Sequence, residues 1–240
     1  FYDWHASRAH GCLTKRLPRN FSGVIQCDGF RAYQTYANKQ PNVTLAGCWS
    51  HARRGFHDAR ESSPTWAGWI LRQIQNLFKI ERELQEQKAG PALREAVRQW
   101  QSRPIIERIK RALFRIKANP ACLPESLIGK AIDYTLNQST TLEVYLDDGR
   151  VEISNNLVEN AIRPTKLGAK NWMFIGAEDA GWRSAVLYSL ITSCKNRGVE
   201  PYSYFCWLFK RLPNATNQQI TELTPKGYAQ VIEDRRRLAS

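Results

Sequence analysis

The α/β character of the chain is set by a short stretch near its start, Val24-Ile25-Gln26-Cys27-Asp28-Gly29. Apolar Val24 and Ile25 precede an Asp-Gly pair, a pattern that predicts a short buried strand ending in a turn. We therefore expect Asp28 at the end of a strand, with its side chain presented at the edge of a sheet. An Asp-Gly pair is also common in plain turns, and spacing alone leaves both interpretations open.

A second stretch, Ser154 to Pro164, reads Ser-Asn-Asn-Leu-Val-Glu-Asn-Ala-Ile-Arg-Pro. It predicts a helix that carries Glu159 in its first turn or two and is capped by the side chain of Ser154 or Asn155. Arg163 follows Glu159 at i+4, where it can bind phosphate or pair with the glutamate. Taken alone, a glutamate on a helix is most often a solvated side chain.

Residues 62–147 lie between these stretches and are predicted to be helical, because apolar residues recur there at near-helical spacing. We further predict strands over 23–28 and 43–48, and helices over 30–37, 49–60 and 180–197, from Pro201 onward and in the tail. Asn171 to Gly176 favours a strand or extended segment, and residues 213–225 a polar linker.

One predicted helix, residues 105–117, has an apolar stripe on one face and a basic face opposite. The basic residues are Arg108, Lys110, Arg111, Arg115 and Lys117. Such a face either tracks DNA or is a solvated surface, and the sequence leaves both open.

The chain has 240 residues, of which 42% are hydrophobic, so it can bury a globular core. Lys and Arg outnumber Asp and Glu by 35 to 22, which gives a formal net charge of +13. This charge favours a polyanionic partner, either nucleic acid or an anionic membrane surface, or it serves solubility alone. No run of about 18 apolar residues is present, so we expect no membrane span.

Six cysteines are spread over the chain, and no two of them form a Cys-x-x-Cys pair. Most have apolar neighbours, which favours free thiols in a reducing cytoplasm over disulfides. Cys48, His51 and His57 suggest zinc, but a fourth ligand is missing and the spacing fits no standard site. The simpler interpretation is one helix with Cys48 packed inward and with Arg53 and Arg54 facing outward.

Asp28 and Glu159 are the two carboxylates that suggest chemistry in so basic a chain. Phosphodiester cleavage is assisted by two divalent ions about 3.5–4 Å apart, which activate the attacking oxygen and stabilise the leaving one. Mg²⁺ prefers a few hard oxygen ligands from the protein and leaves other positions to water and phosphate. One carboxylate at a strand end and one on a facing helix meet that requirement.

Four motifs occur in order along the chain and resemble those of the IS66-family insertion-sequence transposases, over about residues 1–210. They are Gln26-Cys27-Asp28-Gly29-Phe30-x-x-Tyr33; Gly47-Cys48-Trp49-x-His51-Ala52-Arg53-Arg54-x-Phe56; Leu146-Asp147-Asp148-Gly149-Arg150-x-Glu152-Ile153-x-Asn155-Asn156-x-x-Glu159-x-Ala161-Ile162-Arg163-Pro164; and Lys170-Asn171-Trp172-x-Phe174-x-Gly176. The chain departs from the family's usual pattern at Phe30, where Tyr is usual, and at Asn160, where Arg is usual.

The resemblance implies a DDE transposase with an RNase H-like fold. The expected fold is α/β, with a mixed sheet that is incomplete at the N-terminus and a large α-helical insertion between the second and third acids. Asp28 corresponds to the second aspartate and Glu159 to the glutamate, and both would hold Mg²⁺ or Mn²⁺. The first aspartate is expected upstream of residue 1, with Asp3 as the fallback candidate, so this chain alone is expected to be nearly inactive.

Further residues are assigned by their position in the motifs. We predict DNA contacts for Arg53, Arg54, Arg163, Lys166 and Lys170, and positions near the site for Asp3, His51, Asn155 and Asn156. Residues 1–61 and 148–212 are expected to form the two parts of the catalytic core. Residues 62–147 would be the helical insertion, and 213–240 a linker and basic tail.

The expected function is Mg²⁺-dependent phosphodiester hydrolysis and strand transfer at the ends of an insertion sequence. The alternative is a non-catalytic basic DNA-binding fragment of a truncated or decayed transposase, and a simple nuclease is a weaker third option. The partners would be DNA and, because two ends are joined, further copies of the chain. The expected location is the bacterial cytoplasm at the nucleoid.

Overall fold

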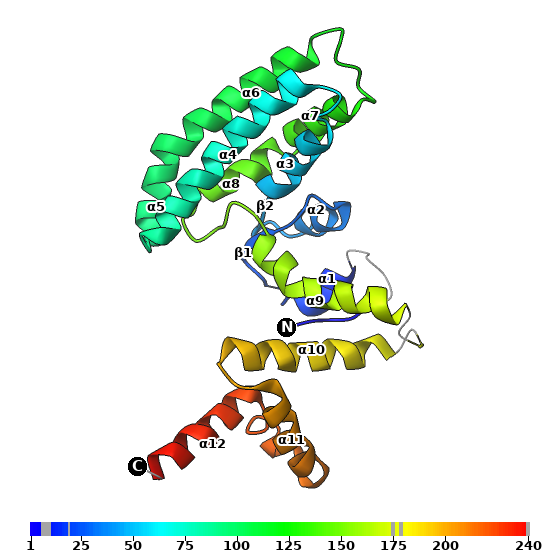
Figure 1. Ribbon diagram of the computed structural model, residues 1–240, viewed down its shortest axis with the longest axis vertical. Coiled ribbons are helices and arrows are strands. Elements are labelled where there is room, and N and C mark those ends of the chain that lie inside the picture. The colour runs from blue at the N-terminus through cyan, green and yellow to red at the C-terminus, as the bar shows by residue number, and fades with distance from the viewer. Residues whose placement is uncertain (6–10, 19, 174–175, 178–179, 239–240) are drawn as a thin grey trace. The chain divides into compact units, whose positions relative to one another are not determined.

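The computed structural model describes residues 1–5, 11–18, 20–173, 176–177 and 180–238 (Figure 1). The chain divides into two compact units, one made of Ala9–Glu159 and the other of Phe1–Arg8 with Asn160–Ser240. Most of the described residues are helical. No helix in the described ranges is both long and apolar enough to cross a membrane. The four-part domain division expected from the sequence stays a prediction.

Strands β1 (Gly23–Gln26) and β2 (Val43–Ala46) pair in parallel, with Gly23 opposite Val43 and Gln26 opposite Ala46. The ladder continues one residue further, because the Cys27 N–H donates to the Ala46 carbonyl at 2.9 Å. Both predicted strands are therefore confirmed, each two residues shorter than expected. Within the described part of the chain the sheet has these two strands, so the larger mixed sheet stays a prediction.

The helices of the first unit follow the sequence prediction, except for the first of them, which was not predicted. They are α1 (Gly11–Arg16), α2 (Arg31–Ala37), α3 (Trp49–Asp58), α4 (Pro64–Glu86), α5 (Pro91–Val97), α6 (Arg103–Lys117), α7 (Leu127–Asn137) and α8 (Ser139–Asp147). A π-helical turn, Arg98–Ser102, joins α5 to α6 without a break. The first unit ends with Asn156 to Glu159, which form the first turn of α9 (Asn156–Trp172).

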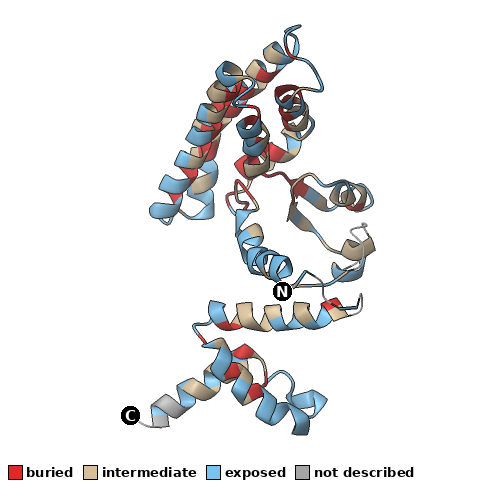
Figure 2. Ribbon diagram, turned by 45° about the vertical axis from the view of Figure 1, so that its right-hand side comes forward, coloured by how far each residue is buried: buried red, intermediate tan, exposed pale blue. Residues whose placement is uncertain are grey.

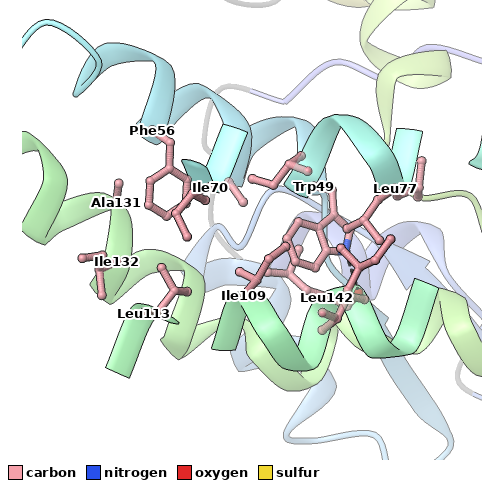
Figure 3. Close-up of a cluster of buried hydrophobic side chains, with 14 of the residues drawn as sticks. Trp49, Phe56, Ile70, Leu77, Ile109, Leu113, Ala131, Ile132 and Leu142 are labelled. Carbon is pink, nitrogen blue, oxygen red and sulfur yellow. Dashed lines mark hydrogen bonds between the residues drawn. The ribbon is translucent and has the colours of Figure 1, made fainter. Parts of the chain in front are cut away.

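The apolar stripes of α3, α4, α6, α7 and α8 pack into one core (Figure 3). Phe56, Ile70, Leu77, Ile109 and Ile132 are completely buried within it. Burying such side chains contributes about 1.5–3 kcal/mol each, which explains why residues spaced for one helix face turn toward one centre.

A buried ion pair lies in this core, between Arg98 of the π-helical turn and Glu81 of α4. Arg98 is fully buried and donates to Glu81 from Nε at 2.8 Å and from Nη2 at 2.7 Å. Its Nη1 donates to the carbonyl oxygens of Tyr145 and Asp148 at the end of α8, at 2.7 and 3.1 Å. Every charge is thus matched by a partner, as a buried arginine requires.

The second unit contains the rest of α9 together with α10 (Gly181–Asn196), α11 (Pro201–Arg211) and α12 (Pro225–Leu238). Helix α10 ends just before Gly198, whose φ of +64° is the left-handed conformation typical of a helix stop. A small core forms around Tyr204, whose hydroxyl donates to the Leu223 carbonyl at 2.8 Å.

One prediction for this unit is wrong. Asn171 and Trp172 end α9 instead of forming an extended segment, because the helix continues past Pro164; residues 174–175 of that segment lie outside the described residues. The predicted polar linker contains the 3₁₀ turns Leu212–Asn214 and Asn217–Gln219, and Leu223 near its end is buried in the small core.

Candidate active site

Asp28 lies two residues beyond the last residue of β1, as predicted. Its Oδ1 accepts the Phe30 backbone N–H at 3.0 Å, which closes the turn, and its backbone carbonyl accepts the Tyr134 hydroxyl at 2.9 Å. Gly29 has φ +84°, and a Cβ at this position would lie 3.1 Å from the Gln138 side chain. The backbone conformation therefore favours glycine at this position, and a larger residue would also have to displace the end of the Gln138 side chain.

Tyr134 of α7 anchors the Asp28 turn, and sequence analysis did not find it. Burial, reinforced by the nearby Cys48, Asp28 and Cys27, raises the pKa of Tyr134 to about 12. The phenol therefore keeps its proton at neutral pH and remains a hydrogen-bond donor. Tyr134 occurs inside the apolar stripe of a helix, where nothing in the sequence distinguishes it from an ordinary core residue.

The carboxyl ends of β1 and β2 meet at one edge of the sheet, because the strands are parallel and in register. Asp28 follows β1, and His51 lies in the first turn of α3, which follows β2. In open α/β sheets, sites form outside the carboxyl ends of the strands. The topology therefore brings Asp28 and His51 to the same edge.

Glu159 contacts His51 directly, with its Oε1 3.3 Å from His51 Nε2. The glutamate is in the first turn of α9, and its backbone N–H donates to the Asn155 carbonyl at 3.1 Å. His51 is far from Glu159 in the sequence, and their contact links the glutamate helix to the edge of the sheet.

The segment that leads into α9 is fastened to three other elements. Gln26 of β1 donates to the Glu152 carbonyl at 2.5 Å, and the Trp49 backbone N–H donates to the Ile153 carbonyl at 3.1 Å. Arg94 of α5 makes a two-pronged contact with the Glu152 carboxylate, both bonds being 2.9 Å. These contacts fix where α9 begins, and so where Glu159 lies.

Among the residues that the structure describes, two polar atoms near the starts of α9 and α3 are buried without a hydrogen-bond partner, namely Asn155 Oδ1 and His51 Nδ1. The predicted capping role of the Asn155 side chain is therefore wrong, and its backbone carbonyl accepts from Val158 and Glu159 instead. A buried acceptor without a partner is costly, so these atoms are free to engage a group that enters the site.

Asn156, the first residue of α9, is exposed and lines a hollow of about 470 Å³ together with Arg94 and Glu152. Arg53 and Arg54 are exposed on α3, whereas Cys48 and Trp49 are buried. The simpler interpretation of this helix, with one side packed and the arginines outward, is confirmed.

Arg163, Lys166 and Lys170 are exposed on the part of α9 that belongs to the second unit. Asp3 also belongs to the second unit, where its Oδ2 lies 2.7 Å from His5 Nε2. The roles expected for these four residues stay predictions.

Within the described ranges, no three His, Cys, Asp or Glu side chains are grouped so that they could hold a metal ion. The zinc interpretation of Cys48, His51 and His57 accordingly gains no support. All six cysteines are free thiols, four of them buried, and burial raises the pKa of Cys27. Asp28 and Glu159 supply carboxylate oxygens but are not joined by a third acid in the described residues.

Comparison with known proteins gives two family matches. Residues 1–183 match the family model described as "Transposase IS66 family", and residues 189–225 match the "IS66 C-terminal element". No solved structure matches the chain.

Three curated proteins of Sinorhizobium fredii (strain NBRC 101917 / NGR234) are similar to the chain. Uncharacterized protein y4jD is 37% identical over 221 residues, and uncharacterized protein y4qI is 33% identical over 220 residues; each alignment covers 88% of this chain. Uncharacterized protein y4hP is 30% identical over 222 residues, covering 85% of this chain. The chain spans 42%, 40% and 39% of the lengths of these relatives.

Proposed function

The chain belongs to the IS66 transposase family, and from this premise we propose that it is the catalytic portion of a DDE-type DNA transposase with an RNase H-like fold. The observation that carries the proposal is the contact between Glu159 and His51, at the edge where the Asp28 strand ends. This contact joins residues of two of the four sequence motifs, and Asp28 of a third motif follows the neighbouring strand.

The donor set fits Mg²⁺ or Mn²⁺. Asp28 Oδ2 and Glu159 Oε2 make no hydrogen bond or ion pair with any residue that the structure describes, so each carboxylate has an oxygen available. These oxygens are the hard ligands that both ions prefer. When bound, the ions neutralise phosphate charge and stabilise the attacking and leaving oxygens.

The chain's own residues would orient the reaction. His51 would hold one oxygen of Glu159 and leave the other available, and Tyr134 would hold the Asp28 turn. Water would attack a phosphodiester at the end of the insertion sequence, and the freed 3′-hydroxyl would then attack target DNA. Arg53, Arg54, Arg163, Lys166 and Lys170 would bind the DNA phosphates.

A third acid is required and would come on a strand outside this chain. Among the described residues β1 pairs with β2 alone. A hollow of about 390 Å³ lies between β1 and the segment of Asp148 to Glu152. Because two DNA ends must be joined, we propose that further copies of the chain assemble on DNA.

The test is a strand-transfer assay with DNA that carries the insertion-sequence ends, in Mg²⁺ or Mn²⁺. The chain is assayed with and without an upstream segment that carries the first aspartate. We expect near-background product from the chain alone and strand transfer from the extended protein, abolished by Glu159→Gln. Robust turnover by the chain alone would show that the acid set is wrong.

A non-catalytic DNA-binding fragment is the second candidate, favoured by the absence of a third grouped acid in the described residues. Here affinity would come from phosphate neutralisation and would fall steeply with salt. DNA binding indifferent to Glu159→Gln, with no strand transfer by the extended protein, supports this candidate. Cleavage without joining indicates a nuclease.

A further inference from the structure

We propose that a basic groove between α4 and α6 binds the phosphate backbone of DNA, at a place that shares no residue with the candidate active site. The groove has a volume of about 460 Å³ and is lined by Trp69, Arg108, Arg111, Ala112, Arg115 and Ile116. This inference rests on the proposed function only in taking DNA as the partner.

The basic side chains of α6 fall into two groups. Lys110 lies 2.7 Å from Glu143, and Lys117 lies 2.6 Å from Asp133, so acids of the same unit neutralise both lysines. The second group comprises Arg108, Arg111 and Arg115, which form no ion pair with any residue in the described ranges and are exposed. Arg111 donates to a backbone carbonyl, that of Glu107, at 3.4 Å.

The three arginines lie on one face of α6, because their positions are related by i, i+3 and i+7. Seven residues of α-helix rise about 10.5 Å, whereas successive phosphates of one DNA strand rise about 3.4 Å along the duplex axis. The row of guanidinium groups therefore spans about three phosphates. Each guanidinium can donate two hydrogen bonds to one phosphate.

The floor of the groove is part of the folded core. Trp69, Ala112 and Ile116 are half-buried and pack against the buried side chains of α4 and α6. The groove is thus preformed, and binding would not require the helices to move. A basic face that serves only solubility does not require a recess. It also does not require that the arginines lack acidic partners while the neighbouring lysines are paired with acids.

The test measures how the affinity for a short fluorescent duplex of arbitrary sequence depends on salt. The 240-residue chain is compared with a variant that combines Arg108→Gln, Arg111→Gln and Arg115→Gln. The slope of log affinity against log salt changes by about 0.9 for each phosphate contact, so we expect the triple variant to lose roughly 2.7 from the slope.

A matched control removes the same charge from lysines that are already paired, by Lys79→Gln, Lys117→Gln and Lys130→Gln. These lysines lie 3.8, 2.6 and 3.0 Å from Glu83, Asp133 and Glu125. The slope of the control variant is expected to differ from that of the parent chain by less than about 0.9, the value of one phosphate contact. A third variant with lysine at all three arginine positions should keep most of the slope, and circular dichroism checks that all variants are folded.

Equal slopes for the chain and the arginine variant overturn the proposal, as does a chain that binds duplex DNA without salt dependence. The triple arginine variant is also tested on vesicles of equal parts phosphatidylserine and phosphatidylcholine. If this variant loses binding to the vesicles but keeps the DNA binding of the parent chain, the proposal is overturned in favour of a membrane surface. The Glu159→Gln variant separates the two proposals, because it should bind DNA with the parent slope whether or not strand transfer occurs.

Discussion

Helices α3–α8 pack into a core with fully buried side chains, whereas none of residues 156–171 of α9 is buried (Figure 2). The first region is stabilised by the burial of apolar side chains and by the ion pair between Arg98 and Glu81. The glutamate helix is held at its start by a few named contacts, from His51, Asn155, Gln26 and Arg94. Substitutions that affect folding and those that affect chemistry should therefore fall in different places.

The strongest way to sharpen this comparison is to remove the partner of the buried arginine. Glu81→Ala leaves the charge of Arg98 without compensation in the core, and we expect a loss of about 3–5 kcal/mol in the free energy of unfolding. Replacing both residues, Glu81→Leu with Arg98→Met, should recover most of that loss. Urea denaturation measures the free energy of unfolding of both variants. Equal stability of Glu81→Ala and of the double variant would show that an unpaired Arg98 costs nothing in the core.

The second prediction concerns the contact that positions the glutamate. We expect His51→Ala to lower strand transfer by the extended protein about 10–100-fold, the usual effect of losing a residue that orients a metal-holding side chain. His57→Ala is the matched control on the same helix, since His57 is exposed and lies 3.7 Å from Asp58. Equal activities of the two variants would place His51 outside the site.

Tyr134→Phe tests the bond between α7 and the Asp28 turn. Loss of the hydrogen bond should cost about 1 kcal/mol at neutral pH. The pKa of Tyr134 is raised from 10.0 to about 12 in the folded state, so its stabilising contribution is present below pH 10 and is lost as the pH rises to 12. The variant should therefore lose less stability over that interval than the parent. Chemical denaturation at several alkaline pH values gives the comparison.

The smallest effect should come from the exposed side of α9. Ile162 is 43% exposed and Ile109 is fully buried. We expect Ile162→Ala to change the free energy of unfolding by less than about 0.5 kcal/mol, whereas Ile109→Ala should cost about 2–5 kcal/mol. Similar losses from the two substitutions, measured by thermal unfolding, would remove the distinction between the regions.

Periodic features were predictable from the sequence. The strands that end near Asp28 and Cys48, the helices of residues 64–147 and the long helix before Gly198 follow from local patterns of apolar residues and turn formers. The prediction for Asn171 to Gly176 was wrong at Asn171 and Trp172, because the helix that contains Pro164 continues to Trp172. Arg98, Tyr134 and Arg94 were missed because their roles depend on partners 17 to 106 positions away.

The amino-acid sequence by itself determined the family and singled out Asp28 and Glu159 as the two candidate carboxylates, because the motifs are contiguous strings. Tertiary structure alone decided which partners those residues have. The pairing of His51 with Glu159, the match of lysines to acids on α6 and the unmatched arginines beside them follow from packing. Contacts between distant residues depend on how the helices close around the core, and no local pattern encodes them.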